Sequence, residues 1–122
     1  MVNGSCLCGA VSYEISGAMR DVLVCHCNQC RKTSGHVVAA TSVPKDNLTI
    51  TKDEGLAWYH SSDIAKRGFC KTCGSSLFWW PMNEGIVSVH VGAIDGPTGL
   101  KTARHIFTDA KGDYYDIPET EP

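Results

Sequence analysis

The sequence predicts an all-β domain that is mainly antiparallel and contains at most one short helix. Apolar and polar residues alternate over short segments, and turn-forming residues separate these segments at intervals typical of all-β domains. Helical periodicity is weak outside one short stretch. The 122 residues are near the usual size of one domain, and no linker divides them. We therefore expect a single domain over residues 1–122, with a core from about residue 4 to residue 107 and a loose C-terminal tail.

The first predicted strand, residues 10–15, follows Gly9, alternates apolar and polar side chains, and ends at Ser16 and Gly17. The other predicted strands cover residues 22–24, 36–43, 48–51, 56–61, 66–69, 77–80 and 86–91. From residue 108 onward the chain is polar and contains proline, which predicts a surface strand followed by loose residues.

One short helix is predicted over residues 28–33. It follows the middle group of cysteines directly, and Ser34 and Gly35 should end it.

The charge balance and the chain ends narrow the class of protein. The formal net charge is −2 and the isoelectric point is near 6.2, so nothing favours binding to nucleic acid. The first residues lack the features of a secretory signal, and no apolar run is long enough to span a bilayer. We expect a cytoplasmic protein that binds neither nucleic acid nor membranes; the sequence makes no prediction about its oligomeric state.

All seven cysteines lie in short clusters. They follow the patterns Cys-x-Cys at residues 6–8, Cys-x-Cys-x2-Cys at residues 25–30 and Cys-x2-Cys at residues 70–73. Structural disulfides are rare in a reducing cytosol, and inert buried thiols would not cluster in this way. Zinc prefers about four ligands in a tetrahedron, and thiolates suit it. Glycine follows the first and last clusters, at residues 9 and 74, and permits the tight reversal that such sites need.

Seven thiols divide best into a group of four and a group of three. Three thiols within six residues can converge on one metal ion without help from elsewhere. The predicted second site is therefore Cys25, Cys27 and Cys30. The remaining cysteines, which would form a closed structural zinc site, are Cys6, Cys8, Cys70 and Cys73. That structural site would join the first strand to a segment more than sixty residues later.

The three-cysteine site has two interpretations. An open fourth position would be typical of a catalytic zinc, whereas a fourth protein ligand (His26, His36 or an acidic side chain) would make a second closed site. His26 lies between two ligands, so we expect it to point away from the metal as a second-shell or surface residue. His36 could also form part of the rim or act as a proton shuttle. Redox chemistry at the three thiols is a further alternative.

A zinc ion with three thiolates carries a formal charge of about −1, so nearby cations should offset it. Arg31, Lys32 and the backbone amides at the start of the predicted helix are placed for this. Such a metal favours binding and deprotonating a thiol over activating water, because coordination removes the thiol proton. A small thiol is therefore the expected substrate.

Three ordered cysteine motifs and one later segment resemble the glutathione-dependent formaldehyde-activating enzyme family, which shares its domain with centromere protein V. The matching segments are Gly-Ser-Cys-Leu-Cys-Gly-Ala-Val at residues 4–11, Cys-His-Cys-Asn-Gln-Cys-Arg-Lys at 25–32, Arg-Gly-Phe-Cys-Lys-Thr-Cys-Gly-Ser-Ser-Leu at 67–77, and Val-Gly-Ala-Ile-Asp-Gly-Pro at 91–97. The resemblance implies a β-tent fold, one structural zinc on the four cysteines, and a second, labile zinc on the other three, where glutathione is thought to act. It also implies a carbon–sulfur lyase activity in which glutathione thiolate adds to formaldehyde to give S-hydroxymethylglutathione.

The competing functional hypothesis is a zinc-stapled binding module for a protein partner, with no chemistry of its own. Other residues have simpler expected roles. Trp79 and Trp80 are neighbours on a strand, so one should lie in the core and the other at the surface or in a cleft. Lys66 and Arg67 are expected to be solvated surface charges, with binding of glutathione carboxylates as the alternative. His90 is expected to be a plain strand residue.

Overall fold

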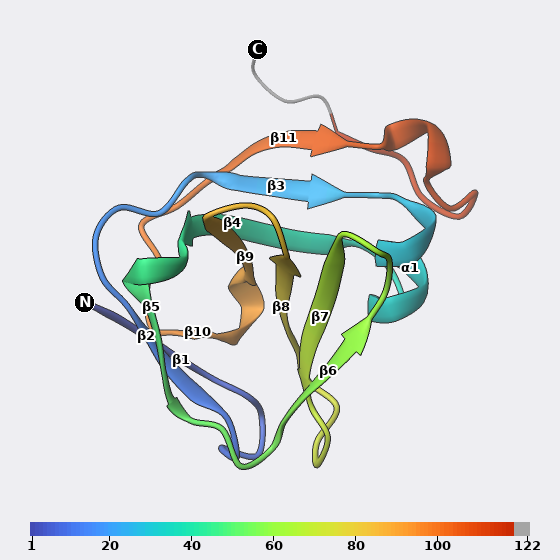
Figure 1. The fold of residues 1–122 in the computed structure, drawn as a ribbon. Helices are drawn as coiled ribbons and strands as arrows, with labels where there is room; N and C mark the ends of the chain where they lie inside the picture. The colour runs from blue at the N-terminus through green and yellow to red at the C-terminus, as the bar shows by residue number, and fades with distance from the viewer. Residues whose placement is uncertain (119–122) are drawn as a thin grey trace.

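The computed structural model describes residues 1–118, which form two β-sheets and one short helix, α1 (Asn28–Ser34) (Figure 1). The strands are β1 (Val2–Ser5), β2 (Ser12–Ile15), β3 (Val22–Cys25), β4 (Val38–Pro44), β5 (Leu48–Lys52), β6 (Leu56–His60), β7 (Ala65–Cys70), β8 (Ser76–Pro81), β9 (Ile86–His90), β10 (Ile94–Asp95) and β11 (Thr102–Ile106). Single 3-10 turns cover Lys45–Asn47, Val91–Ala93 and Thr108–Ala110. Among residues 1–118, no helix is long and apolar enough to cross a bilayer.

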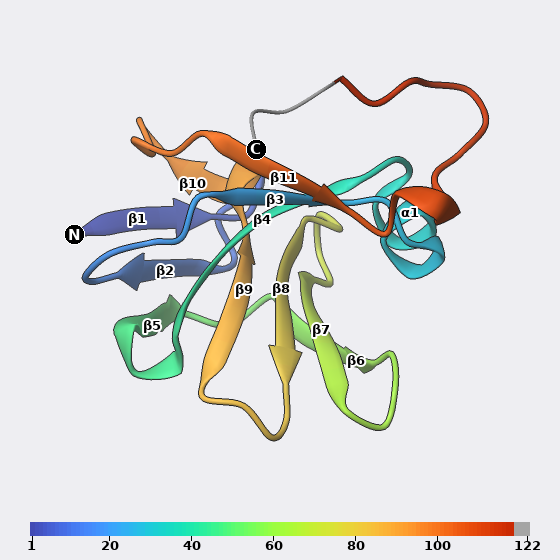
Figure 2. The ribbon, with the colours of Figure 1, turned by 90° about the horizontal axis from the view of Figure 1, so that it is seen from above.

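The smaller sheet has the strand order β10-β1-β2-β5, and the larger has the order β11-β3-β4-β9-β8-β7-β6. Figure 2 shows β1 and β2 beside the larger sheet, whose strands β3, β4 and β11 cross above β7, β8 and β9. The pairs within both sheets are antiparallel except for β11 and β3, which run parallel with Ile106 opposite Cys25. Parallel pairing needs a long connection, and here the ordered chain between β3 and β11 supplies it.

The small sheet follows from alternation along β2, where Tyr13 and Ile15 are buried and Glu14 is half-exposed. Gly4 of β1 lies opposite Tyr13. A Cβ atom at Gly4 would lie within the volume of the Tyr13 ring, so only glycine lets the ring cross the neighbouring strand.

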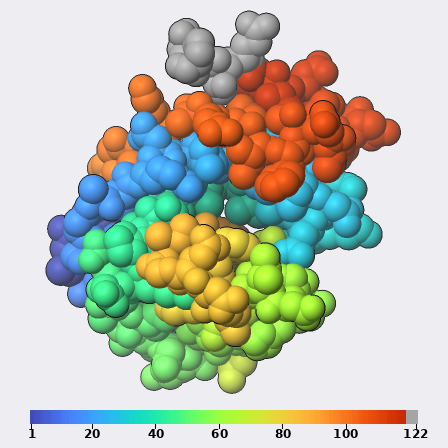
Figure 3. All heavy atoms as spheres, turned by 45° about the horizontal axis from the view of Figure 1, so that its top comes forward, coloured from blue at the N-terminus to red at the C-terminus, as the bar shows by residue number. Residues whose placement is uncertain are grey.

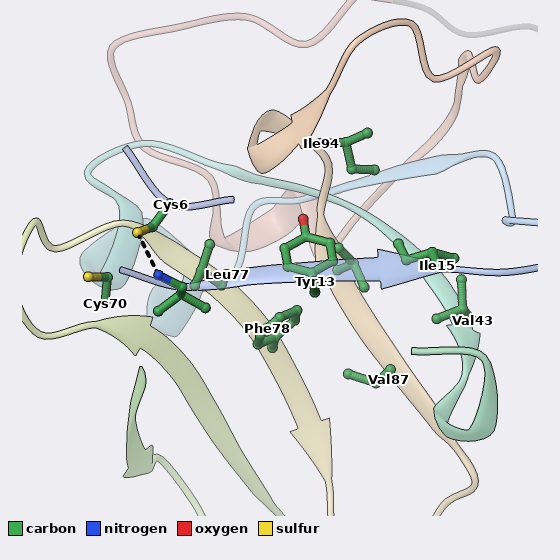
Figure 4. Close-up of a cluster of buried hydrophobic side chains, with 11 residues drawn as sticks. Cys6, Tyr13, Ile15, Val43, Cys70, Leu77, Phe78, Val87 and Ile94 are labelled. Carbon is green, nitrogen blue, oxygen red and sulfur yellow. Dashed lines mark hydrogen bonds between the residues drawn. The ribbon is translucent and has the colours of Figure 1, made fainter. Parts of the chain in front are cut away.

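The main core lies between the sheets. Tyr13 packs edge-on against Phe78, with 5.2 Å between the ring centroids. Figure 4 shows Cys6 and Cys70 at one end of this core and Ile15 at the other. The end that carries the cysteines is therefore continuous with the hydrophobic core.

The predicted class, a mainly antiparallel β fold with one short helix, is confirmed. The eight predicted strands correspond to β2 to β9, and the helix ends at Gly35 as expected. Three short strands were missed: β1, β10 and β11. β1 and β11 are largely polar and β10 has two residues, so pairing with a neighbour defines them better than their own pattern does.

The prediction of a surface strand after residue 108 is wrong. Phe107 adopts a left-handed backbone conformation, with φ of 54°, and turns the chain out of β11 into a 3-10 turn. In the segment after this turn, Tyr114 and Tyr115 form hydrogen bonds with histidines on either side of α1, as described below. Residues 119–122, the end of the expected loose tail, lie outside the described residues.

Candidate metal centre and pocket

Four cysteines converge where β1, β7 and β8 meet. They are Cys6, Cys8, Cys70 and Cys73, and their sulfur atoms all lie within 4.8 Å of one another. Two of the sulfur–sulfur distances, Cys6 to Cys8 and Cys8 to Cys70, are 3.7 Å. Zinc–sulfur bonds of about 2.3 Å in a tetrahedron place the sulfurs roughly 3.8 Å apart. The four thiols therefore fit a closed tetrahedral zinc site.

Local backbone geometry aims these sulfurs. Gly9 and Gly74, which follow the two motifs, have φ of 83° and 82°, a region that favours glycine. The Gly74 amide donates to the Cys70 carbonyl at 2.7 Å, and the Cys73 amide donates to Cys70 Sγ at 3.5 Å. The Ser75 hydroxyl lies 3.2 Å from Cys73 Sγ and lowers the pKa of that thiol to about 5. Cys73 is thus held toward the thiolate, the form that binds metal.

The second group comprises Cys25, Cys27 and Cys30, whose sulfurs also lie within 4.8 Å of one another. Cys25 ends β3, Cys27 caps α1, and Cys30 lies in the first turn of α1. Cys27 Sγ accepts a hydrogen bond from the Cys30 amide at 3.3 Å. Within residues 1–118, no histidine or carboxylate joins this group as a fourth ligand.

The three thiols are electrostatically unequal. A hydrogen bond from Cys25, followed by contacts with Cys27 and Arg67, lowers the pKa of Cys30 to about 5. The same interaction with Cys30 raises the pKa of Cys25. A thiol cluster that already favours one thiolate fits a borderline-soft cation such as zinc.

The three cysteines form part of the wall of a pocket of about 380 Å³. Its apolar lining consists of Leu23, Val38, Ala40, Ile64, Trp79, Ile106 and Phe107. The charged and polar side chains at the pocket are Arg20, Gln29, Ser62, Arg67, Ser88 and His90. No aspartate or glutamate of the described residues lines it.

Strand alternation explains why these residues share one face. Leu23 of β3 lies opposite Ala40 of β4, which lies opposite His90 of β9. Trp79 of β8 similarly lies between Ser88 of β9 and Arg67 of β7. Side chains two residues apart on a strand point the same way, so the larger sheet presents one continuous surface to the pocket.

Arg67 is buried, contrary to the expectation of a solvated charge; only 6% of it is exposed. Its Nε donates to Gln29 Oε1 at 2.7 Å, and its Nη2 lies 3.7 Å from Cys30 Sγ. Lys66 lies on the other face of β7, where its Nζ is 4.3 Å from the centroid of the Trp58 ring. Arg67 is therefore the cation that faces the three-cysteine group.

The expectation that Arg31 and Lys32 offset the charge of this group is not supported by their positions. Arg31 donates from Nη2 to Asn28 Oδ1 at 2.9 Å, and Lys32 is exposed. Neither lines the pocket. A helix rotates successive side chains by about 100°, so residues next to Cys30 in sequence point elsewhere.

His90 is buried and lines the pocket, so the expectation of a plain strand residue is wrong. Its Nε2 has no hydrogen-bond partner among the described residues. Burial, with a smaller effect of Arg67, lowers the pKa of His90 to about 4, so the imidazole is neutral near pH 7. The two tryptophans behave as alternation predicts: Trp79 lines the pocket, and Trp80 packs against Trp58 and the core.

His26 points away from its cysteine neighbours, as expected, but it is buried rather than at the surface. Its Nδ1 lies 2.6 Å from the Tyr115 hydroxyl, and its Nε2 lies 2.8 Å from His105 Nδ1. The His26 amide also donates to the carbonyl of Ile106 at 3.0 Å. Figure 3 shows the orange and red C-terminal segment lying over β3 and beside α1. We call the His26–Tyr115 contact the C-terminal clamp.

His36 is exposed, and its Nδ1 pairs with the Tyr114 hydroxyl at 2.9 Å. It does not line the pocket and does not join the three sulfurs, so its placement does not support a role as ligand or rim residue. The sequence reasoning also missed Gln29, which holds Arg67 in place. Its position in the sequence, one residue before Cys30, was the signal that could have identified it.

Comparison with known proteins agrees with this site. Residues 1–110 match the family described as glutathione-dependent formaldehyde-activating enzyme. An uncharacterized lyase of Schizosaccharomyces pombe is 27% identical over 115 residues, which cover 93% of this chain and 83% of that protein. A crystal structure of a Rhodobacter sphaeroides protein superposes with a TM-score of 0.68 at 26% identity, covering 84% of this chain and 98% of the other. Because the family match spans most of the sequence, the chain belongs to the glutathione-dependent formaldehyde-activating enzyme family.

Proposed function

We propose that the protein is a carbon–sulfur lyase that adds glutathione or another small thiol to formaldehyde. One observation carries the proposal: three convergent thiols, with no fourth ligand among the described residues, line a largely apolar pocket of about 380 Å³. An open metal position beside a pocket is typical of catalytic rather than structural zinc sites. Family membership and the lyase name of the Schizosaccharomyces pombe relative support the same class of reaction.

The proposed reaction needs no oxidant or reductant. The thiol sulfur forms a bond to the formaldehyde carbon, the carbonyl π bond opens, and the thiol proton is transferred to the carbonyl oxygen. The product is the S-hydroxymethyl adduct. The protein has to favour the thiolate and hold the two reactants together, which replaces a bimolecular encounter by a step within the pocket.

In this proposal Cys25, Cys27 and Cys30 hold a labile zinc ion, and the other four cysteines hold a structural one. The labile ion would supply acidification of an incoming thiol. Arg67, 3.7 Å from Cys30 Sγ, offsets the negative charge of three thiolates. Apolar walls limit water at the reacting atoms and strengthen these electrostatic interactions.

The alternative, a zinc-stapled binding module, requires two closed metal sites. The pocket, and the lack of a fourth ligand for the three thiols within residues 1–118, weigh against it.

The test combines metal content with turnover. Zinc per chain is measured by elemental analysis with and without excess glutathione, and adduct formation from glutathione and formaldehyde is followed by NMR exchange above the uncatalysed rate. We expect one zinc to remain firmly bound while a second is lost or exchanged with glutathione, and we expect catalysis by the loaded protein.

The variant Cys27→Ser should abolish catalysis and the second zinc while retaining the first. Lys32→Gln, exposed on the same helix, is the matched control and should behave like the wild type. Two zinc ions held firmly against glutathione, with no rate above background, would contradict the proposal.

A further inference from the structure

The pocket holds positive charge that no carboxylate neutralises. Arg67 and Arg20 both line it, and no acidic side chain of the described residues does. Within residues 1–118, the one ion pair joins Lys52 and Glu54, and neither residue lines the pocket. Buried arginines are normally paired, and among the described residues the Cys30 sulfur is the one partner of opposite charge near Arg67, so Arg67 can also bind an anionic ligand.

Arg67 has hydrogen-bonding capacity to spare. A guanidinium has five N–H donors, and the described contacts use Nε, toward Gln29, and one terminal nitrogen, toward Cys30. Gln29 fixes the plane of the guanidinium, and a guanidinium held in this way is suited to binding a carboxylate through two parallel hydrogen bonds.

His90 adds a second unpartnered polar group on the same face. Only 7% of the residue is exposed, and Nε2 lacks a partner. The ring also contacts the Ser76 backbone, so His90 borders the site as a neutral imidazole and adds no negative charge to the pocket. His90 lies two residues from Ser88, which pairs across Trp79 with Arg67, so the two groups belong to one stretch of the pocket wall.

We propose that Arg67 forms an anion subsite that selects short mercaptocarboxylates, thiols whose carboxylate lies two or three carbons from sulfur and which carry no ammonium group. The proposal rests on the proposed function, because the thiol sulfur is taken to lie against Cys25, Cys27 and Cys30.

Distances set the length of the ligand. Arg67 Nη2 lies 3.7 Å from Cys30 Sγ, and neighbouring sulfurs in the four-cysteine cluster are separated by the same 3.7 Å. A substrate sulfur at that spacing from Cys30 lies at most roughly 7.5 Å from the guanidinium nitrogen, and a hydrogen bond takes about 2.9 Å of this. The remaining span is at most about 4.5 Å, which a mercaptoacetate or a mercaptopropionate can bridge.

Charge sets the selectivity. Arg67 faces the three-cysteine group, and the exposed Arg20 lines the pocket while its Nη2 donates to the Ala40 carbonyl. Positive charge on this wall attracts carboxylate and repels ammonium. Glutathione carries an ammonium group, and its nearest carboxylate lies beyond a peptide bond from the cysteine sulfur. It therefore fits this subsite less well than a mercaptocarboxylate does.

The test is thiol binding to full-length protein carrying cobalt in place of zinc, followed through the cobalt absorption bands. The probes are 3-mercaptopropionate, the neutral analogue 3-mercapto-1-propanol, the cationic cysteamine, and glutathione. We expect 3-mercaptopropionate to bind roughly tenfold to hundredfold more tightly than the neutral analogue, the range for a hydrogen bond to a charged group. Cysteamine should bind most weakly, and glutathione more weakly than 3-mercaptopropionate.

Variants assign the preference to the subsite. Arg67→Gln should reduce the ratio between 3-mercaptopropionate and 3-mercapto-1-propanol to about one. Lys66→Gln, one residue away on the opposite face of β7, should leave the ratio unchanged. If Arg67→Gln does not fold, the thiol series on the wild-type protein still decides the question.

The outcomes separate this inference from the proposed function. Equal affinity for anionic and neutral thiols, or tighter binding of glutathione or cysteamine, overturns the anion subsite and leaves thiol binding intact. No spectral response to any thiol overturns both. An unchanged ratio in a folded Arg67→Gln protein overturns the assignment to Arg67.

Discussion

Close packing around the four-cysteine group leaves no room for a side chain at Gly55. A Cβ atom there would lie 2.8 Å from Cys70 Sγ and 2.8 Å from the Ala10 side chain. We expect Gly55→Ala to destabilise the zinc-loaded protein by about 1–3 kcal/mol, the usual cost of overpacking, and to speed zinc release. Urea unfolding and a chromogenic chelator measure the two effects.

Gly85→Ala is the matched control, because a Cβ at Gly85 meets nothing within 4 Å. Equal zinc release from the two variants would show that space beside Cys70 is not limiting.

His90 should give the stability a distinct pH dependence. Its pKa is lowered to about 4 in the folded protein by burial and then by Arg67, whereas an unfolded histidine titrates near ~6.5. Between these values the unfolded chain binds more protons, so this contribution is complete above pH ~6.5 and is lost as the pH falls toward 4. The expected loss is about 3 kcal/mol.

Urea unfolding across this pH range should show a steeper acid loss for the wild type than for His90→Gln. His60→Gln, at an exposed position on β6, should keep the wild-type slope. Parallel pH profiles for wild type and His90→Gln would contradict the assignment.

Among the elements, the connection of β3, α1 and the C-terminal segment decides how the three cysteines are held. The clamp bonds Nδ1 of His26, the residue between Cys25 and Cys27, and His105 bonds its Nε2. Because the His26 side chain is held away from the pocket, the neighbouring Cys25 and Cys27 can line it.

We expect Tyr115→Phe to weaken cobalt binding at the three-cysteine group by roughly tenfold, because a buried His26 nitrogen loses its partner. Cobalt titration of each site measures this, and the four-cysteine group in the same molecule serves as an internal reference. Tyr114→Phe is the matched control, since its hydroxyl pairs with the exposed His36. Equal cobalt affinities for the two variants would rule out a positioning role for the clamp.

At the scale of the whole molecule, the two metal groups should contribute unequally to stability. The four-cysteine group joins chain segments more than sixty residues apart, whereas the other group lies within six residues. Closing a long loop removes more freedom from the unfolded chain, and binding at a structural zinc site is coupled to folding.

We expect Cys73→Ser to lower the free energy of unfolding by several kcal/mol and Cys27→Ser to lower it far less. Urea unfolding of both variants in the presence of zinc tests this. A larger loss for Cys27→Ser would reverse the assignment of structural and labile sites.

Much of the fold could be predicted because its signals are local. Alternation placed eight strands, and cysteine spacing gave the two groups that the structure brings together. β11 could not be predicted, because its polar residues form a strand only where β3 offers a parallel partner. The tail was predicted as a strand, although the left-handed turn at Phe107 redirects it.

The sequence by itself determined the class of fold, the grouping of the seven cysteines, and the glycine turns that aim them, because each depends on residues near one another in the chain. Only the tertiary structure decided that Arg67 is buried beside Cys30, that His90 lines the pocket, and that Tyr115 holds His26. These contacts join residues 37 or more positions apart. The register between strands and the return of the C-terminal segment toward β3 bring them together. Burial and charge pairing at such distances depend on the assembled sheets, and no local pattern encodes them.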